Sequence, residues 1–262
     1  MAEQPIRFDD GAAYEKMMGT WSALAGDVFL DWLAPPQGLR CVDVGCGNGA
    51  LIERIVQRCE PAEMQGIDPS AGQLAFARTR PGAKMAKFQQ GDAMALPFAD
   101  SAFDLATMAL VLFFVPDPAK GVAEMVRVVK SDGTVAAYTW DILGGGFPFE
   151  PVQKHMRARG MKPPLPPSVE ASRLENTLAL WSGAGLKDIE TREIIVQRTF
   201  RDFDEFWSIT TLGPSMAPII GAMPGDDRKA LMDQVRRTLP ADGAGRITCS
   251  ARANAIKGRV AK

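Results

Sequence analysis

The sequence is short of the residues that build metal sites and membrane spans. It has one histidine, His155, and its four cysteines form no CxxC pair, so we expect no metal site. Basic and acidic residues nearly cancel, 30 against 31, which argues against nucleic acid as a partner. The longest apolar stretch, 105–115, is too short to span a bilayer, so we expect no transmembrane segment.

Targeting signals are also missing from the part of the chain where they would be expected. Residues 1–10 show no cationic region followed by an apolar core, so we expect no secretory signal. We therefore predict a cytoplasmic protein with reduced cysteines. Its 262 residues, 46% hydrophobic and 23% charged, suit one large globular domain or a domain with a lid.

Hydrophobic periodicity alternates between strand-like and helix-like along the first half of the chain. Apolar residues recur at helical spacing in 20–33 and 51–59, Ser70 is a good N-cap, and Asp117-Pro118 is typical of a helix start. Helices alternating with strands imply right-handed crossovers and a mostly parallel sheet. The predicted strands are 40–44, 64–67, 83–88, 103–112 and 134–140, with Ser131-Asp132-Gly133 as the turn into the last.

The pattern changes after Asp141. Gly144–Gly146 is typical of a hinge, and 147–172 is rich in proline with a short helix expected around His155. We predict an α/β fold: a doubly wound, seven-stranded, mostly parallel sheet with helical lid insertions, the segments 8–20 and 144–170 closing over the site. The single domain divides into an N-terminal helical cap at 1–36, a cofactor-binding core at 37–141, insertions at 142–173 and 200–242, and last strands at 174–199 and 243–262. Within these we expect a helix at 174–183, strands at 186–199 and 246–256, and broken helices over 202–240.

A glycine-rich loop follows the first predicted strand, in the run Val42-Asp43-Val44-Gly45-Cys46-Gly47-Asn48-Gly49. Glycines let a ligand approach the backbone closely, and in doubly wound sheets ligands bind at this crevice. The spacing is not GxGxxG, because position 50 is alanine, and no P-loop sequence occurs. A tight turn without a ligand is the alternative.

Two further acidic residues follow predicted strands. Asp68 suits a carboxylate that accepts hydrogen bonds from ribose hydroxyls, although it could equally cap a helix. Asp92 could accept from an adenine amino group, or serve only in a turn. Together with the glycine loop, these residues predict a nucleoside site.

The stretches VDVGCGNGALIERIV, GIDPS, GDAMALPFADSAFD and LVLFFVPDPAKGVAEMVRVVKSDGTV resemble the class I S-adenosylmethionine-dependent methyltransferases. Within them, the chain is most similar to the type 11 group that includes ubiquinone- and menaquinone-biosynthesis methyltransferases. The resemblance covers about 40–140. It implies S-adenosyl-L-methionine as cofactor and S-adenosyl-L-homocysteine as product.

The resemblance also implies roles for individual residues. The methionine half of the cofactor would lie against Asp43, Gly45, Cys46 and Gly47, the glycine amides and carbonyls meeting its amino and carboxylate groups. One departure is that Phe113-Phe114 stands where relatives often have a histidine. The remaining roles would be the ribose for Asp68 and Pro69, the adenine for Asp92 and Ala93, the floor near the sulfonium for Met108 and Ala109, and a cover over the cofactor for Tyr14.

The methyl acceptor is harder to predict. His155 is the natural general-base candidate, and an ordinary surface histidine is the alternative. Aromatic residues could form an apolar pocket for a small apolar or aromatic acceptor, although each could instead be core, and the helices could make a homodimer surface. These aromatics are Trp21, Phe113, Phe114, Trp140, Phe147, Phe149 and Trp207. Two other functions stay open: a non-catalytic S-adenosylmethionine-binding or regulatory module, and a nucleotide-dependent oxidoreductase.

Overall fold

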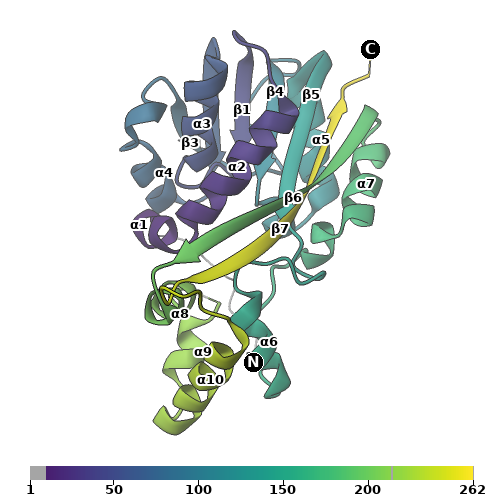
Figure 1. Ribbon diagram of the computed structural model, residues 1–262. Helices are drawn as coiled ribbons and strands as arrows, with labels where there is room; N and C mark the ends of the chain where they lie inside the picture. The colour runs from purple at the N-terminus through teal and green to yellow at the C-terminus, as the bar shows by residue number, and fades with distance from the viewer. Residues whose placement is uncertain (1–9, 214, 262) are drawn as a thin grey trace.

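A computed structural model describes residues 10–213 and 215–261 of the protein. Residues 1–9, which carry most of the stretch expected to lack a secretory signal, lie outside the described part. The core is a seven-stranded sheet in the order β3-β2-β1-β4-β5-β7-β6 (Figure 1). The strands are β1 Arg40–Val44, β2 Glu63–Asp68, β3 Lys87–Gln90, β4 Phe103–Ala109, β5 Val129–Trp140, β6 Lys187–Phe200 and β7 Ile247–Arg259.

The sheet is mostly parallel, as the alternation of strands and helices predicts. The pairs β1–β2, β1–β4, β2–β3 and β4–β5 are parallel, whereas β7 runs antiparallel to both β5 and β6. The chain order reverses between β1 and β4, because β2 and β3 lie on one side of β1 and the later strands on the other. Ligands of doubly wound sheets bind at such a switch point. The predicted doubly wound, seven-stranded fold is confirmed.

Helices cover both faces of the sheet (Figure 1). One face packs against apolar side chains of α2, α3 and α4, the other against those of α5 and α7. Among the described residues, none of these helices is long and apolar enough to cross a membrane. The helices on these faces are α2 Thr20–Leu33, α3 Ala50–Cys59, α4 Ala71–Ala77, α5 Pro118–Val128 and α7 Leu174–Gly183.

A group of helices from the two late insertions gathers beyond the lower end of the sheet in Figure 1, where β6 ends. We call this group, α6 with α8–α10, the helical lobe. At the same end of the sheet, the short helix α1 and the π-helical turn η1 lead into α2, and η1 contacts α8 of the lobe. The bounds are α1 Gly11–Tyr14, η1 Glu15–Gly19, α6 Glu150–Ala158, α8 Phe203–Thr210, α9 Ala217–Gly221 and α10 Gly225–Thr238, with 3₁₀ turns at η2 Pro81–Ala83, η3 Leu112–Phe114 and η4 Val169–Ser172.

Three local predictions are wrong in part. The strand expected at 83–88 begins only at Lys87, because Pro81–Ala83 form the 3₁₀ turn η2. The strand expected at 103–112 ends at Ala109. The turn expected at Ser131-Asp132-Gly133 lies inside β5, where Asp132 has a φ of 63° and the register against β4 shifts. This is the geometry of a bulge, which accommodates turn-forming residues within a strand.

The glycines expected to form a hinge are held by hydrogen bonds. The amide of Gly146 donates to the Asp141 carbonyl at 2.7 Å, and its carbonyl accepts from the Arg252 amide at 2.8 Å. A Cβ at Gly146 would lie 2.7 Å from the Arg252 carbonyl oxygen. Glycine is therefore required here for close approach of two backbones, and this contact weighs against a free hinge.

Candidate functional site

A cavity of about 580 Å³ lies at the carboxyl ends of β1, β2, β4 and β5, where the sheet meets the η1 turn. Its two sides differ in chemistry. Over β1 and β2 it is polar and is lined by the glycine loop and by Asp43, Asp68, Pro69, Ser70 and Gln73. Over β4 and β5 it is apolar and is lined by Phe113, Phe114, Trp140, Phe147, Phe149 and Pro167.

The glycine loop brings its backbone to the polar side. Gly45 has a φ of 72°, and a Cβ there would lie 2.4 Å from Val111 Cγ1, so both the conformation and the close approach require glycine. The amides of Gly45 and Cys46 donate to the Ile67 carbonyl at 2.8 and 2.9 Å, and the Gly47 amide donates to Asp68. These amides are already bonded within the protein, so the loop offers a ligand chiefly carbonyl oxygens, which suit a donor such as an ammonium group.

Asp68 ties the glycine loop to the end of β2. One carboxylate oxygen accepts from the Gly47 amide and the other from the Ser70 amide, at 2.8 and 2.9 Å. The N-cap of α4 is Ser70, whose hydroxyl accepts from the Gln73 amide. Asp68 is therefore not the cap of this helix. Each of its oxygens keeps acceptor capacity that faces the cavity, and burial raises the pKa of the carboxyl.

Asp43 lies deeper, at the end of β1, and is 1% exposed. Its carboxylate accepts from the Thr107 hydroxyl at 2.7 Å, across the β1–β4 pair. Burial raises its pKa to about 7, and the nearby Asp68 adds to this rise, while the Thr107 hydrogen bond opposes it. Among the described residues that line the cavity, Asp43 and Asp68 are the only charged side chains. The site is therefore built to receive positive charge.

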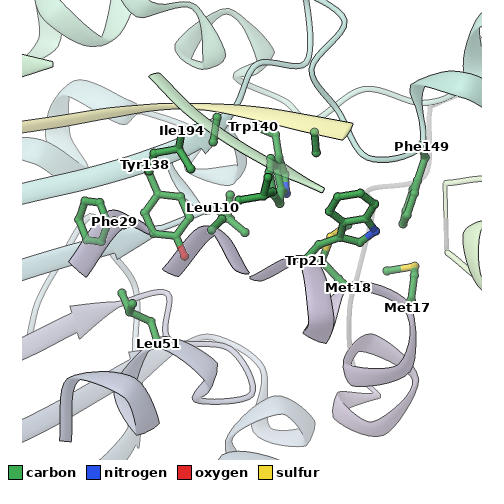
Figure 2. Packing of buried hydrophobic residues seen from close by; sticks show 14 of the residues in the cluster. Met17, Met18, Trp21, Phe29, Leu51, Leu110, Tyr138, Trp140, Phe149 and Ile194 are labelled. Atoms are coloured by element: carbon green, nitrogen blue, oxygen red, sulfur yellow. The ribbon is translucent and has the colours of Figure 1, made fainter. Parts of the chain in front are cut away.

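The N-terminal segment reaches the cavity through the η1 turn. Tyr14, Met17, Met18 and Ser22 all line it, at spacings that put them on one helical face. Burial raises the pKa of the Tyr14 hydroxyl to about 12, so it stays protonated. A π-helical turn such as η1 is common at functional sites. Figure 2 shows Met17 and Met18 on this segment, facing the same region as Phe149.

The chain bends sharply after β4, and this bend shapes the cavity floor. Leu110 lines the cavity with a φ of 62°, an uncommon conformation for a branched side chain. Its amide donates to the Tyr138 carbonyl at 2.8 Å, which holds the bend against β5. The preceding Ala109 also lines the cavity. Met108, expected beside it, is fully buried on the opposite face of the sheet, because neighbouring residues of a strand alternate between faces.

The cavity thus collects most of the residues predicted from the sequence. Those that line it are Tyr14, Asp43, Gly45, Cys46, Gly47, Asp68, Pro69, Ala109, Phe113, Phe114, Trp140, Phe147 and Phe149.

Other predicted site residues lie elsewhere. Asp92 is exposed, and its carboxylate accepts from the Met94 amide at 2.8 Å, while Ala93 packs against the core of the far face. Trp21 is 1% exposed within the core, 6.5 Å from the Phe200 ring. Trp207 stacks on Phe203. None of them lines the cavity, because the turn after β3 and the packing of α2 and α8 direct them away.

His155 is in the helical lobe rather than at the cavity. Its Nε2 lies 3.0 Å from the Thr238 hydroxyl, which connects α6 to α10. Burial and the cations Lys154, Arg159 and Arg237 lower its pKa. It does not line the cavity, which weighs against His155 as the catalytic base.

Several lining residues were missed in the sequence. Met17, Met18 and Ser22 follow Tyr14 at positions i+3, i+4 and i+8, so a helix carrying Tyr14 could have predicted them. Ser215, Gly213 and Pro167 come from segments without periodicity, and nothing in the sequence points them at the site. Tyr138 could have been found from its place near the end of β5.

Residues 42–137 match the family described as a methyltransferase domain, of type 11. This segment holds most of β1 and β5, the whole of β2, β3 and β4, the glycine loop and both carboxylates of the cavity. Residues 42–137 form a methyltransferase domain.

Curated relatives match less than half of the chain. A demethylmenaquinone methyltransferase of Desulfitobacterium hafniense (strain Y51) is 40% identical over 105 residues, which cover 38% of this chain and 42% of the relative. The chain thus matches less than half the length of that relative.

Solved structures resemble the whole chain in fold. The YcgJ protein of Bacillus subtilis has a TM-score of 0.60 at 21% identity, covering 91% of this chain and 98% of that one. Phosphoethanolamine N-methyltransferase 2 of Haemonchus contortus, solved with phosphomonomethylethanolamine and S-adenosylhomocysteine, has a TM-score of 0.58 at 18% identity, covering 96% of this chain and 57% of that one. At these identities the likeness shows the fold of the methyltransferase domain and its flanks alone.

Proposed function

We propose that the protein is an S-adenosylmethionine-dependent methyltransferase whose acceptor is a small, apolar, electron-rich aromatic ring of the phenol or hydroquinone type. The observation that carries this proposal is the division of the cavity. Two buried carboxylates and the carbonyls of the glycine loop lie on one side, and aromatic side chains lie on the other.

The polar side suits this cofactor better than a dinucleotide. S-adenosylmethionine carries an ammonium and a sulfonium, so the negative charge of Asp43 and Asp68 complements it. A dinucleotide would bring a pyrophosphate, whose negative charges find no lysine, arginine or histidine among the described residues that line the cavity. The amides that usually hold a pyrophosphate are also engaged within the loop.

The residues of this chain would hold the cofactor and the acceptor in place and shield them from water. S-adenosylmethionine, when bound, supplies a methyl group activated by the positively charged sulfur. Asp68 would hold the ribose hydroxyls and Asp43 would complement the positive charge, while Tyr14 and Met18 would cover the site. The aromatic side would exclude water and orient the acceptor, an effect worth roughly 7–11 kcal/mol in well-ordered sites.

The apolar side also argues for the class of acceptor. Its lining includes no aspartate, glutamate, histidine or lysine, so the described part of this chain offers no general base there. A ring that already donates electrons, such as a phenol or hydroquinone, can take the methyl group at carbon as the sulfur–methyl bond breaks. It can then release the displaced ring proton to water instead of to a side-chain base. The demethylmenaquinone methyltransferase that matches part of this chain is named for a quinone, whose reduced form is a hydroquinone.

Calorimetry of ligand binding tests the identity of the cofactor, and an assay of turnover tests the reaction and its acceptor. We expect S-adenosylhomocysteine to bind and NADH to show no comparable binding. A panel of phenols, hydroquinones, amines and thiols would then be assayed for S-adenosylhomocysteine formation, with activity expected on the first two. Tighter binding of NADH would reject the methyltransferase. Binding without turnover of any acceptor would favour the non-catalytic module, and turnover of amines alone would reject the proposed acceptor class.

A further inference from the structure

Three stretches of the chain, around Glu15, at 48–53 and around Arg80, meet at the side chain of Arg80. Its Nε donates to the Asn48 carbonyl at 2.6 Å, and its Nη1 pairs with Glu53 Oε2 at 3.1 Å. Its Nη2 pairs with Glu15, whose same oxygen accepts from Asn48 Nδ2 at 2.6 Å. We call these four residues, Glu15, Asn48, Glu53 and Arg80, the latch.

The latch is unlike the surface ion pairs of this protein. The side chains of Arg80, Glu53 and Glu15 are 10%, 17% and 38% exposed, whereas the Asp31 side chain that pairs with Arg58 is 70% exposed. Partly buried, charge-assisted hydrogen bonds that share one guanidinium are stronger and less screened than exposed pairs. The latch should therefore hold its segments together firmly.

The latch joins the N-terminal segment that covers the cavity, residues 11–19, to the glycine loop. Glu15 opens the η1 turn, which carries Met17 and Met18, and it directly follows Tyr14. Asn48 belongs to the glycine loop, is buried, and lines the cavity itself. Opening the cover therefore requires Glu15 to leave both Asn48 and Arg80.

We propose that the latch couples the N-terminal cover to the glycine loop, with Glu15 as a positioning residue that slows release of the bound cofactor without touching it. This proposal rests on the proposed function, because it assumes that the cavity binds S-adenosylmethionine. It extends that function by naming what sets the residence time of the cofactor.

Glycine at position 19 fits this role. A Cβ there would lie 2.6 Å from the Glu15 Cδ and 2.8 Å from both carboxylate oxygens. The carboxylate is held by Asn48 and Arg80, so it cannot move aside without loosening the latch. Gly19 thus leaves the space in which the Glu15 side chain folds toward Arg80.

The first test compares dissociation rates of S-adenosylhomocysteine, measured by surface plasmon resonance. Glu15→Gln removes the charge and keeps the shape, so we expect dissociation to be roughly 5- to 20-fold faster. Asp31→Asn is the matched control, because it removes an ion pair between α2 and α3 that does not involve the cavity. We expect the control to stay within about 2-fold. Equal rates for E15Q and the wild type would overturn the proposal.

The second test separates the latch from general stability. Gly19→Ala should favour the helix, since alanine is the better helix former, yet it should displace the Glu15 carboxylate. The gain in helix preference and the loss of latch bonds act on the Tm in opposite directions, so the deciding readout is dissociation, which we expect to be faster whichever way the Tm moves. A raised Tm with unchanged dissociation would mean that the contact is only structural, and would reject the latch.

A measurement without cofactor keeps this proposal distinct from the proposed function. Hydrogen exchange of the ligand-free protein should be faster at residues 11–19 in E15Q than in the wild type or D31N. If the wild type fails to bind S-adenosylhomocysteine, the proposed function fails, and this exchange experiment still tests the coupling. Unchanged exchange at 11–19 in E15Q would overturn the latch.

Discussion

The two sides of the cavity differ in how the chain builds them. The polar side comes from consecutive strand ends and the loop after β1, all within the methyltransferase domain at 42–137. The apolar side combines Phe113 of that region with Trp140, Phe147, Phe149, Pro167 and Ser215 from the segments that follow. The side that would hold the cofactor is local and regular, whereas the side that would hold the acceptor is assembled from distant pieces.

If the two sides bind different ligands, substitutions on each side should have different effects. A change on the polar side should weaken cofactor binding for any acceptor, because those residues would contact the common ligand. A change on the apolar side should alter acceptor recognition and leave cofactor binding intact. Substitutions on the two sides should therefore separate in their kinetics.

The largest expected effect comes from Asp68. Asp68→Ala removes the acceptor for the ribose hydroxyls and for the Gly47 and Ser70 amides, so we expect affinity for S-adenosylhomocysteine to fall about 10- to 150-fold, or about 1.5–3 kcal/mol. Isothermal calorimetry measures it. Asp117→Ala is the control, because the Asp117 carboxylate also accepts from a backbone amide, that of Lys120 at the start of α5, but does not line the cavity. Equal affinities of wild type and D68A would remove Asp68 from the binding site.

The next effect concerns the apolar side. Phe147 is half-buried, lines the cavity and packs edge-on against Phe149 at 5.0 Å. Phe147→Ala should raise the KM for the acceptor by about 10-fold, from lost apolar contact, and leave the Kd of S-adenosylhomocysteine unchanged. Phe98→Ala offers a matched control, since Phe98 is also half-buried and edge-on to Phe103 but lies on the other face. A weaker Kd with an unchanged KM would assign Phe147 to the cofactor side.

The same contrast explains what the sequence could predict. Strand ends, the glycine loop and Asp68 follow from short-range patterns, because the end of each parallel strand must reach the same edge. Alternation along β4 could also have been used to place Met108 on the far face, had the strand register been known. The bend at Leu110, by contrast, depends on its tertiary hydrogen bond to Tyr138, which no local pattern encodes.

The helical lobe was predictable as helix but not as part of a site. Breaks at Pro218 and Pro224 do fall at the starts of α9 and α10, as proline at a helix start favours. Whether His155 faces the cavity or α10 depends on how α6 packs, and that is decided by contacts more than eighty residues apart in sequence. The contact that weighs against a free hinge at Gly144–Gly146 is hidden from the sequence for the same reason, because the partner of Gly146 is the distant Arg252.

A moderate effect is expected on the affinity for S-adenosylmethionine, which should depend on pH through the ionisation of Asp43. Its pKa of about 7 in the folded protein is raised above the ordinary value by burial, so its ionisation costs stability as pH rises through 7. A cationic ligand favours the ionised form, so S-adenosylmethionine should bind roughly tenfold more tightly at pH 8 than at pH 6, with a proton released at pH 6. Calorimetry in buffers of different ionisation enthalpy measures this release.

Asp43→Asn provides the comparison for that measurement. The amide cannot ionise, so the pH dependence and the proton release should both disappear. Without ligand, the wild type should lose stability relative to D43N between about pH 4 and pH 7, because the raised pKa contributes stability only while the carboxyl is protonated. A pH dependence that persists in D43N would assign it to another group.

The smallest expected effect is that of His155, and it sharpens the contrast between cavity and lobe. His155 bonds Thr238 on α10 at 3.0 Å and lies outside the cavity lining. His155→Ala should leave kcat and the acceptor KM within about 2-fold and lower the free energy of unfolding by about 0.5–1.5 kcal/mol, the contribution of one hydrogen bond. His155→Gln, which can keep a bond to the Thr238 hydroxyl, should recover part of that stability. Steady-state kinetics and urea unfolding measure the two effects separately. A kcat reduced tenfold in a fully folded H155A would make His155 a base after all, and would require α6 to move toward the acceptor during turnover.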